Sequence, residues 1–269
     1  MIQMFKTMIE EMKLRNFSPQ TQKVYLQYNQ SFLNFARKSP RDVSGQDIRS
    51  YLLHLIEKQY SSSSINLAHN ALNFYYGKLL RKNVKEVPFQ KREEKHRLVP
   101  SKDEIENLCT VIKNPKYQLM ISLLYASGVR VSELVRIKLQ DIDVERKLLR
   151  VRQGKGGKDR YTILSVRVIE QIKAYLQMRP YPSNYLFSSR DGHLTIRAVE
   201  EVLKSAARRA KIQRATPHSL RHSFATHLME SHVRDSVIQK LLGHKDIKTT
   251  QIYASVATKH LQEIKSPHD

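Results

Sequence analysis

Apolar residues recur at helical spacing through the first 84 residues, which lack the strict alternation of half-buried strands. The start signals of these helices are Ser18-Pro19, a capping box formed by Ser44 and Asp47, and the serine run at 61–64. A further amphipathic segment covers residues 2–14. We therefore predict a small helical bundle over residues 1–84, with most of its tyrosines and phenylalanines in the core.

Residues 85–100 are charged, have prolines near both ends and show no periodicity, so they are predicted to be a linker. A second domain is expected over residues 101–269. It opens with a capping box at Ser101 and continues with an apolar helix that ends at Gly128. Arg130 then opens a short helix, in which Glu133 lies three residues on and can fix the direction of the guanidinium.

Residues 139–164 change from a helical to a strand-like pattern, with glycines at 154–157 between two β-rich runs. This predicts a hairpin whose tip carries Lys155 and Lys158. A P-loop is excluded because Asp159 follows Lys158 where Ser or Thr is required. The remaining segments are predicted helices, over 166–178, 195–210, 218–230, 235–242 and around Tyr253. The fold class is therefore mainly α with a small β-sheet.

The amino-acid composition indicates which class of partner this chain binds. The formal net charge is +22, and residues 1–88 contribute +7 of it, so both predicted domains are basic. Such a charge is typical of a protein that binds nucleic acid, although a Lys-rich thermophile surface is an alternative. The single cysteine, Cys109, excludes an internal disulfide, and no apolar run is long enough to span a bilayer. We expect a soluble intracellular protein without a membrane anchor.

The richest chemistry lies between residues 216 and 253. Thr216 and Pro217 are a helix start signal, and Arg221 follows His218 by one helical turn, so both side chains can act on one small group. An arginine fork suits phosphate oxygens, and a histidine can donate to the same group or accept a proton. A zinc site at His218 and His222 is rejected, because no Glu lies between them and Arg221 is adjacent.

The chain resembles the tyrosine recombinases, the family of phage integrases and Xer proteins. The resemblance rests on Arg130 in G-V-R-V-S-E-L, Lys155 in G-K-G-G-K-D-R, H-S-L-R-H from His218 to His222, L-G-H ending at His244, and Tyr253. It covers residues 101–257 with no catalytic position missing, and residues 1–84 are similar in size and pattern to the family's helical, SAM-like core-binding domain. The short chain points to the Xer-like group, with archaeal Xer proteins or integron-type enzymes as its relatives.

The resemblance implies a two-domain, C-shaped clamp that acts on duplex DNA as a homotetramer on paired sites, and as a monomer or weak oligomer off DNA. Tyr253 is then the nucleophile and forms a 3′-phosphotyrosyl link. Arg130 and Arg221 stabilise the phosphorane, Lys155 is the general acid and His218 the proton acceptor. His244 donates a hydrogen bond to the phosphate, and Glu133 orients Arg130. No metal, ATP or other cofactor is expected, and the enzyme would be cytoplasmic and associated with the nucleoid.

Two alternatives use the same features. A type IB topoisomerase has nearly the same chemistry but relaxes DNA as a monomer, whereas a DNA-binding protein without catalysis would not need the reacting groups. Target site and biological role, whether dimer resolution or mobile-element integration and excision, are not encoded in any recognisable motif. The residues after Tyr253 carry a narrow apolar stripe, which predicts a short helix that docks either on its own domain or on the next subunit.

Overall fold

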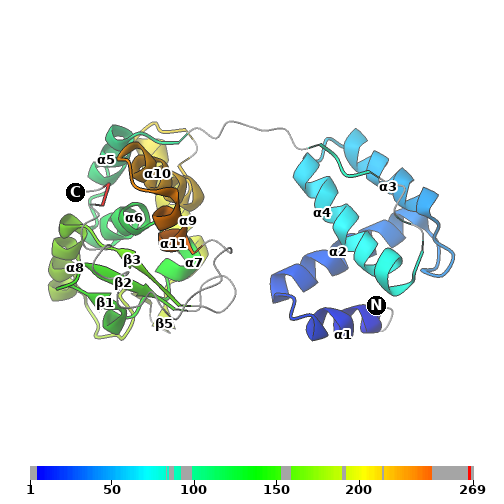
Figure 1. Cartoon of the computed structure of the whole chain (residues 1–269), viewed down its shortest axis with the longest axis horizontal. Coiled ribbons are helices and arrows are strands. Elements are labelled where there is room, and N and C mark those ends of the chain that lie inside the picture. Colours follow the sequence, from blue (N-terminus) through cyan, green and yellow to red (C-terminus); the bar gives the residue numbers. More distant parts are fainter. Residues whose placement is uncertain are drawn as a thin grey trace. The chain divides into compact units, whose positions relative to one another are not determined.

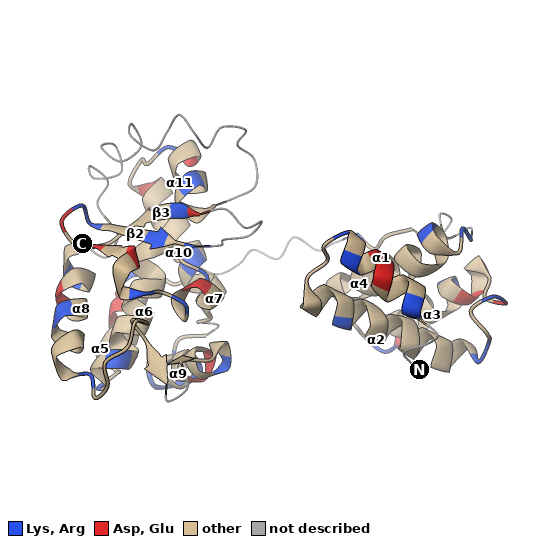
Figure 2. Ribbon diagram, turned by 90° about the horizontal axis from the view of Figure 1, so that it is seen from below, with Lys and Arg blue, Asp and Glu red and all other residues tan. Residues whose placement is uncertain are grey.

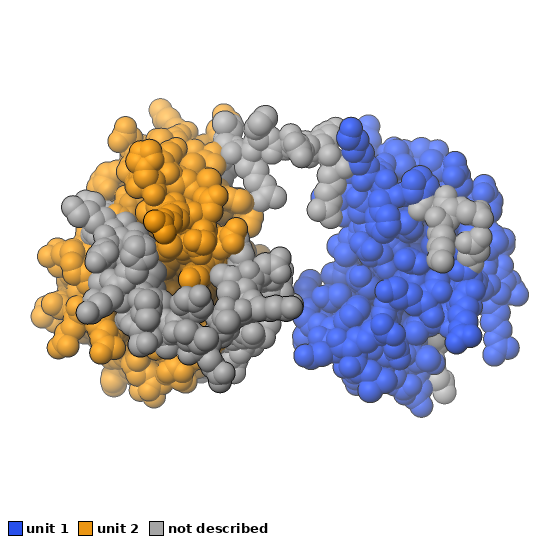
Figure 3. Space-filling view, in the orientation of Figure 1, with its two compact units in different colours: residues 1–96 blue, residues 97–269 orange. Residues whose placement is uncertain are grey.

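The computed structural model describes residues 5–82, 84, 88–91, 99–152, 159–189, 192–213, 215–243 and 266–267. The chain forms two compact units, Met1–His96 and Arg97–Asp269 (Figure 3). Each unit has a hydrophobic core of its own. Lys and Arg occur on the helices of both units (Figure 2).

Unit 1 is helical. Its elements are α1 (Lys6–Leu14), α2 (Pro19–Ala36), α3 (Gly45–Glu57), α4 (Ser62–Leu72) and the π-helix η2 (Asn73–Leu79) (Figure 1). The predicted start signals are confirmed, because Ser18 accepts the first-turn N–H of Thr21 and Ser44 forms a reciprocal capping box with Asp47. Aromatic rings pack together in the core: the ring of Phe32 lies 5.4 Å from that of Tyr51 and 5.3 Å from that of Tyr76, both edge-on.

The last helix of unit 1 differs from the sequence prediction. The apolar residues that follow the serine run, from Ile65 to Leu80, predict one regular helix. In the structure the backbone widens after Leu72, and the N–H of Leu80 donates to the carbonyl of Tyr75 five residues back, at 3.0 Å. The side chain of Asn73 lies so close to Gly77 that a Cβ there would be 2.2 Å from its Oδ1. Because Gly77 has no side chain, the wider turn fits here. The apolar periodicity of the sequence does not predict this turn.

Unit 2 combines helices with two small antiparallel sheets. Its helices are α5 (Lys102–Thr110), α6 (Pro115–Ser127), α7 (Val131–Leu134), the 3₁₀ turn η3 (Leu139–Asp141), α8 (Val166–Met178), α9 (Ile196–Arg209), α10 (Pro217–Glu230) and α11 (Asp235–Leu242). Strands β1 (Ile142–Asp143), β2 (Leu148–Val151) and β3 (Arg160–Ile163) form a sheet in that order. A second hairpin, β4 (Ser188–Ser189) with β5 (Gly192–His193), was not predicted from the sequence.

Helix α6 is the centre of unit 2, and other helices surround it (Figure 1). All its residues from Leu119 to Ser127 are buried, as expected for a helix that is apolar on every face. It packs against α5, α8, α9, α10 and β3. The predicted C-cap is confirmed: Gly128 has a φ of 60°, and a Cβ there would lie 2.3 Å from the Phe224 ring. Because Gly128 has no side chain, Phe224 of α10 can pack against the turn that leads to Arg130.

The predicted hairpin is also confirmed, with Leu148 opposite Ile163 and Val151 opposite Arg160. Arg160 and Thr162 are two residues apart on β3, so they share one face of the strand. Thr162 is fully buried and its hydroxyl donates to the carbonyl of Ser127 at 2.7 Å. That face of β3 therefore points at the end of α6, where the candidate site begins.

Two buried side chains of unit 2, those of Cys109 and Ser266, contact residues of α6. Cys109 is buried, and its Sγ lies 3.6 Å from the Ser122 hydroxyl. Ser266 is also buried, and its hydroxyl donates to the carbonyl of Ala126 on α6 at 2.9 Å.

The predicted tail helix and its stripe lie outside the described residues. No helix in the described part of the chain is long and apolar enough to cross a bilayer.

Candidate active site

Arg130 stands at the turn between α6 and α7. Its backbone N–H donates to Glu133 Oε2 and its Nη1 to Glu133 Oε1, both at 2.8 Å. The carboxylate therefore caps the short helix and holds the guanidinium at the same time. The Arg130 side chain keeps 29% of its surface exposed, against 7% for Glu133. The predicted pairing of these two residues is confirmed, and it leaves the arginine facing outward.

Arg221 reaches the same region from α10. Thr216 caps this helix with Pro217 in the first turn, and Phe224 packs against Gly128 one turn after Arg221. Arg221 is only 7% exposed, and its Nη1 and Nη2 each donate over 2.5 Å, to the carbonyls of Gly128 and Leu242. These bonds use two of the five N–H donors of the guanidinium. They also join α10 to the ends of α6 and α11.

Arg160 is a residue that the sequence interpretation missed. Its Nη1 and Nη2 donate to the two carboxylate oxygens of Glu133, at 2.8 and 2.7 Å, and its Nε donates to the carbonyl of Leu241 at 2.8 Å. The alternation along β3 could have revealed it, since Arg160 lies on the strand face that also carries the buried Thr162. A charged residue on an inward face needs a buried partner, and Glu133 is that partner.

The cluster is strongly cationic. Arg130, Arg160 and Arg221 surround the single carboxylate of Glu133. Burial, together with the positive charges of Arg130 and Arg160, lowers the pKa of Arg221 to about 9, and Glu133 opposes this shift. The guanidinium is still protonated at neutral pH, but its charge is only partly compensated. Such a centre is prepared for an anion with several oxygens, such as a phosphate diester.

Glu133 itself remains ionised despite its burial. Desolvation raises its pKa, but the hydrogen bonds and charge of Arg160, together with the hydrogen bonds from Arg130, outweigh burial and hold the pKa at about 2. The carboxylate is therefore a permanent negative charge that both arginines share. The position of Glu133 therefore fixes the positions of Arg130 and Arg160.

His218 lies in the first turn of α10, on the exposed surface, one turn before Arg221. Its ring is edge-on to that of His222, with centroids 4.6 Å apart. Lys155, His244 and Tyr253 lie outside the described residues, so the predicted site is represented here by Arg130, Glu133, His218 and Arg221. Within the described ranges no three acidic, His or Cys side chains are grouped to hold a metal ion. The metal-free mechanism stays a prediction.

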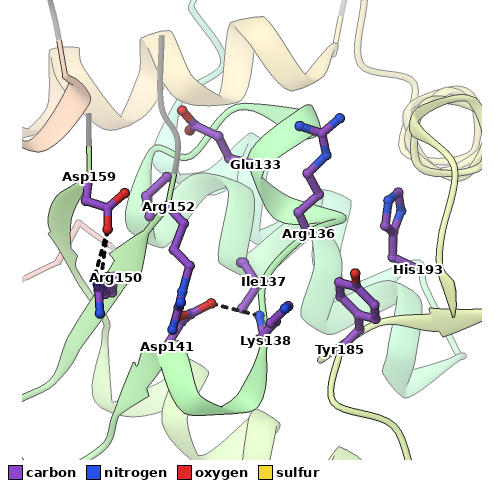
Figure 4. Close-up of a pocket in the computed structure, with 11 residues that line it drawn as sticks. Glu133, Arg136, Ile137, Lys138, Asp141, Arg150, Arg152, Asp159, Tyr185 and His193 are labelled. Atoms are coloured by element: carbon purple, nitrogen blue, oxygen red, sulfur yellow. Dashed lines mark hydrogen bonds and ion pairs between the residues drawn. The ribbon is translucent and has the colours of Figure 1, made fainter. Parts of the chain in front are cut away.

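A pocket of about 430 Å³ adjoins Glu133 and extends over β2 towards the β4–β5 hairpin (Figure 4). Its acidic members are already paired: Asp141 accepts from Arg152 Nε at 2.5 Å, and Asp159 from Arg150 Nη2 at 2.8 Å. The other polar residues of the lining are Arg136, Lys138, Tyr185 and His193. Four Lys or Arg side chains thus face three carboxylates in this lining, so its formal charge is slightly positive.

Comparisons with known proteins agree with this geometry. The model of the phage integrase family matches residues 99–260, and that of the phage integrase N-terminal SAM-like domain matches residues 4–86. Tyrosine recombinase XerA of Pyrococcus furiosus is 38% identical over 94% of this chain and 89% of its own length. Tyrosine recombinase XerC of Anoxybacillus flavithermus is 34% identical over 93% of this chain and 91% of its own.

Solved structures show the same fold. The crystal structure of XerA recombinase aligns with a TM-score of 0.53 and 28% identity, over 99% of this chain and 95% of that one. A lambda integrase fragment, residues 75–356, solved as a dimer bound to a COC′ core site, aligns with a TM-score of 0.74 and 18% identity, over 97% and 95% of the two chains.

The two family models cover both units and thus define the class of this protein as a DNA strand-transfer enzyme. The chain belongs to the phage integrase family and is a Xer-like tyrosine recombinase, that is, a site-specific DNA recombinase. Neither the topoisomerase alternative nor the non-catalytic one is favoured by these relatives.

Proposed function

We propose that this chain cuts and rejoins duplex DNA by transesterification, with Tyr253 as the nucleophile. The phenol oxygen of Tyr253 attacks the scissile phosphorus, the bond from phosphorus to the 5′-oxygen breaks, and a 3′-phosphotyrosyl link forms. Attack by a 5′-hydroxyl reverses the step and releases the tyrosine. Because one phosphoester replaces another, the reaction needs neither ATP nor an external reductant or oxidant.

The described residues would act on the phosphate. Arg130, held by Glu133 and exposed on its outer side, would contact one non-bridging oxygen. Arg221 would contact the phosphate through the N–H donors that Gly128 and Leu242 leave over. Both guanidiniums are placed before the substrate arrives, so they stabilise the charge of the transition state without reorganisation. The convergence of Arg130 and Arg221 on the end of α6 is the observation that carries this proposal.

Protons would move through residues of the family motif. His218, one turn before Arg221, would accept the proton of the phenol, and Lys155 would deliver one to the leaving 5′-oxygen. His244 would donate a hydrogen bond to the phosphate. These three roles rest on the resemblance of the motifs, and His218 lies on the first turn of α10.

The partner would be duplex DNA with paired recombination sites, bound by four copies of the chain inside the cell. Solved relatives were captured with DNA, among them lambda integrase on a core site. The basic charge of both halves supports contacts from unit 1, the expected core-binding domain, as well as from unit 2. The slightly positive pocket beside Glu133 is suited to a neighbouring backbone phosphate.

A nicked suicide duplex tests the assignment. The recombination site for this duplex is first selected from randomised DNA by its binding to the protein. Cleavage of the nicked duplex then traps the covalent protein–DNA adduct. The Tyr253→Phe variant should bind this duplex but form no adduct, whereas Tyr181→Phe, which alters a tyrosine 68% exposed on unit 2, should react normally. Adduct formed by the Tyr253→Phe variant would show that another residue is the nucleophile.

A further inference from the structure

Arg160 makes more contacts to the site than an ordinary ion pair requires. It binds both oxygens of Glu133 and the carbonyl of Leu241, and its side chain is only 10% exposed. Arg130, which shares the same carboxylate, is 29% exposed. Of the two arginines on Glu133, one therefore faces outward to the substrate side and the other is enclosed. Arg160 is placed to act through its neighbours and not on the substrate itself.

We propose that Arg160 is a positioning residue, which keeps Arg130 available to the scissile phosphate and fixes the end of α11 beside it. This inference rests on the proposed function, in which Arg130 acts on that phosphate. The structure supports it through two separate sets of contacts, one at Glu133 and one at α11.

The first set concerns charge. Glu133 accepts four hydrogen bonds, two from Arg130 and two from Arg160. Because Arg160 occupies both carboxylate oxygens, the guanidinium of Arg130 is held through Nη1 alone. Without Arg160, Glu133 would be free to take Arg130 in a bidentate pair, which is the preferred geometry of these groups. Such a pair would turn Arg130 inward and neutralise the charge that the phosphate needs.

The second set concerns α11. The last carbonyls of a helix lack partners within the helix and carry its negative end. Here Arg160 binds the carbonyl of Leu241 and Arg221 binds that of Leu242. Gly243 follows with a φ of 66°, and a Cβ there would lie 2.8 Å from the Cδ of Arg160. Arg160 thus packs directly against the residue that precedes His244 in the sequence.

These contacts join the chain segments that carry the proposed catalytic groups. Strand β3 carries Arg160. Helix α7 carries Glu133 and begins directly after Arg130, and the end of α11 leads to His244. A lysine at position 160 would keep one positive charge. It has a single donor centre, so it could not bind two carboxylate oxygens and the Leu241 carbonyl in the same geometry. Arg160→Lys is therefore the informative substitution, because it separates geometry from charge.

The experiment compares two substrates in single-turnover cleavage. One duplex carries the normal scissile phosphodiester, and the other carries a methylphosphonate there, in which a methyl group replaces a charged oxygen. Arg160→Lys should bind both duplexes normally and cleave the phosphodiester about 10- to 100-fold more slowly, as is typical when a residue that orients a reacting group is lost. The loss should be much smaller on the methylphosphonate, whose transition state places less negative charge beside Arg130.

Arg167→Lys is the matched control. Arg167 lies on α8, binds both carboxylate oxygens of Glu106 and has a side chain 41% exposed, so this variant should cleave both substrates at the parent rate. If Arg160→Lys is poorly folded, the double variant Arg160→Gln with Glu133→Gln replaces the buried ion pair by two hydrogen-bonding amides. It should fold and bind DNA. Because no carboxylate is left to capture Arg130, it should cleave the phosphodiester faster than Arg160→Gln alone, and equal rates would contradict the proposal.

An equal loss on both substrates would reduce Arg160 to a structural residue and overturn the proposal, as would an unchanged rate on the phosphodiester. The Arg130→Ala variant separates this outcome from a failure of the proposed function. If Arg130→Ala cleaves normally, the role of Arg130 is wrong. If Arg130→Ala is slow while Arg160→Lys is not, only the inference about Arg160 fails.

Discussion

Tyr125 and His227 form a buried hydrogen bond between α6 and α10, with 2.9 Å between the phenol oxygen and Nδ1. The Tyr125 hydroxyl also donates to the carbonyl of Pro267 at 3.1 Å. A hydroxyl has one proton to give, so the ring nitrogen must be the donor in the first bond. Nδ1 of His227 therefore carries a proton, and a short chain of hydrogen bonds runs from α10 through α6 to the C-terminal segment.

This arrangement predicts an acid-sensitive contribution to the stability of unit 2. Burial lowers the pKa of His227, and Lys102 lowers it further, while Glu230 opposes them. Below the unfolded value of about 6.5 the unfolded chain binds a proton that the folded chain resists, so the free energy of unfolding falls as pH falls. In denaturant titrations from pH 7.5 to 5, His227→Gln should weaken this dependence.

Glu133 should give a signature of the same sign, but at lower pH. Its folded pKa is about 2, so its ionised form adds stability in full above the unfolded pKa and loses it as pH falls towards 2. At neutral pH the contribution is on the order of 3 kcal/mol, from the difference between the two pKa values. Glu133→Gln should lower the free energy of unfolding at pH 7, and the gap to the parent should close in acid. A gap that is independent of pH would contradict the assigned charge.

Arg221→Lys should damage both stability and cleavage. A lysine ammonium cannot bridge the carbonyls of Gly128 and Leu242, which lie on opposite sides of the buried guanidinium. We expect single-turnover cleavage to fall by about 10²- to 10³-fold, the usual cost of one lost transition-state donor. Thermal unfolding and DNA binding of the same variant show how much of the loss is structural. A parent-like cleavage rate would exclude Arg221 from the reaction.

Ser266 offers a test of the docked C-terminal segment. Its hydroxyl donates to the carbonyl of Ala126 in a buried site, so Ser266→Ala should lower the free energy of unfolding by about 1 kcal/mol. Ser189→Ala, which removes a bond in an exposed hairpin, should have a smaller effect. Equal effects would mean that the contact of this segment with α6 is not populated in solution. Docking of the preceding tail helix in another subunit stays a separate prediction.

Much of the fold could be predicted because its local signals are strong. Ser44, Ser101 and Thr216 each cap a helix as their sequence context indicates, and Gly128 ends α6 where only a glycine fits. These features depend on a few neighbouring residues, so the sequence alone contains them. The pairing of Arg130 with Glu133 was predictable for the same reason.

The missed features depend on residues far apart in the chain. Arg160 meets Glu133 across 27 positions and Leu241 across 81, so its place in the strand sequence did not reveal its partners. The fork of Arg221 was expected to face a phosphate, but two of its donors bind backbone carbonyls that only the tertiary fold brings near. The switch to a π-helix at Asn73 depends on how one side chain lies against Gly77, which apolar periodicity does not contain.

Cys109 gives the chain a practical property. Its thiol is fully buried on α5, and burial raises its pKa, so at neutral pH it is shielded from alkylating reagents. As it is the single cysteine of the chain, one cysteine introduced on the surface would carry a fluorophore at one known position. The native thiol need not be removed first. Energy transfer from such a dye to labelled DNA could then follow site capture by the intact enzyme in real time.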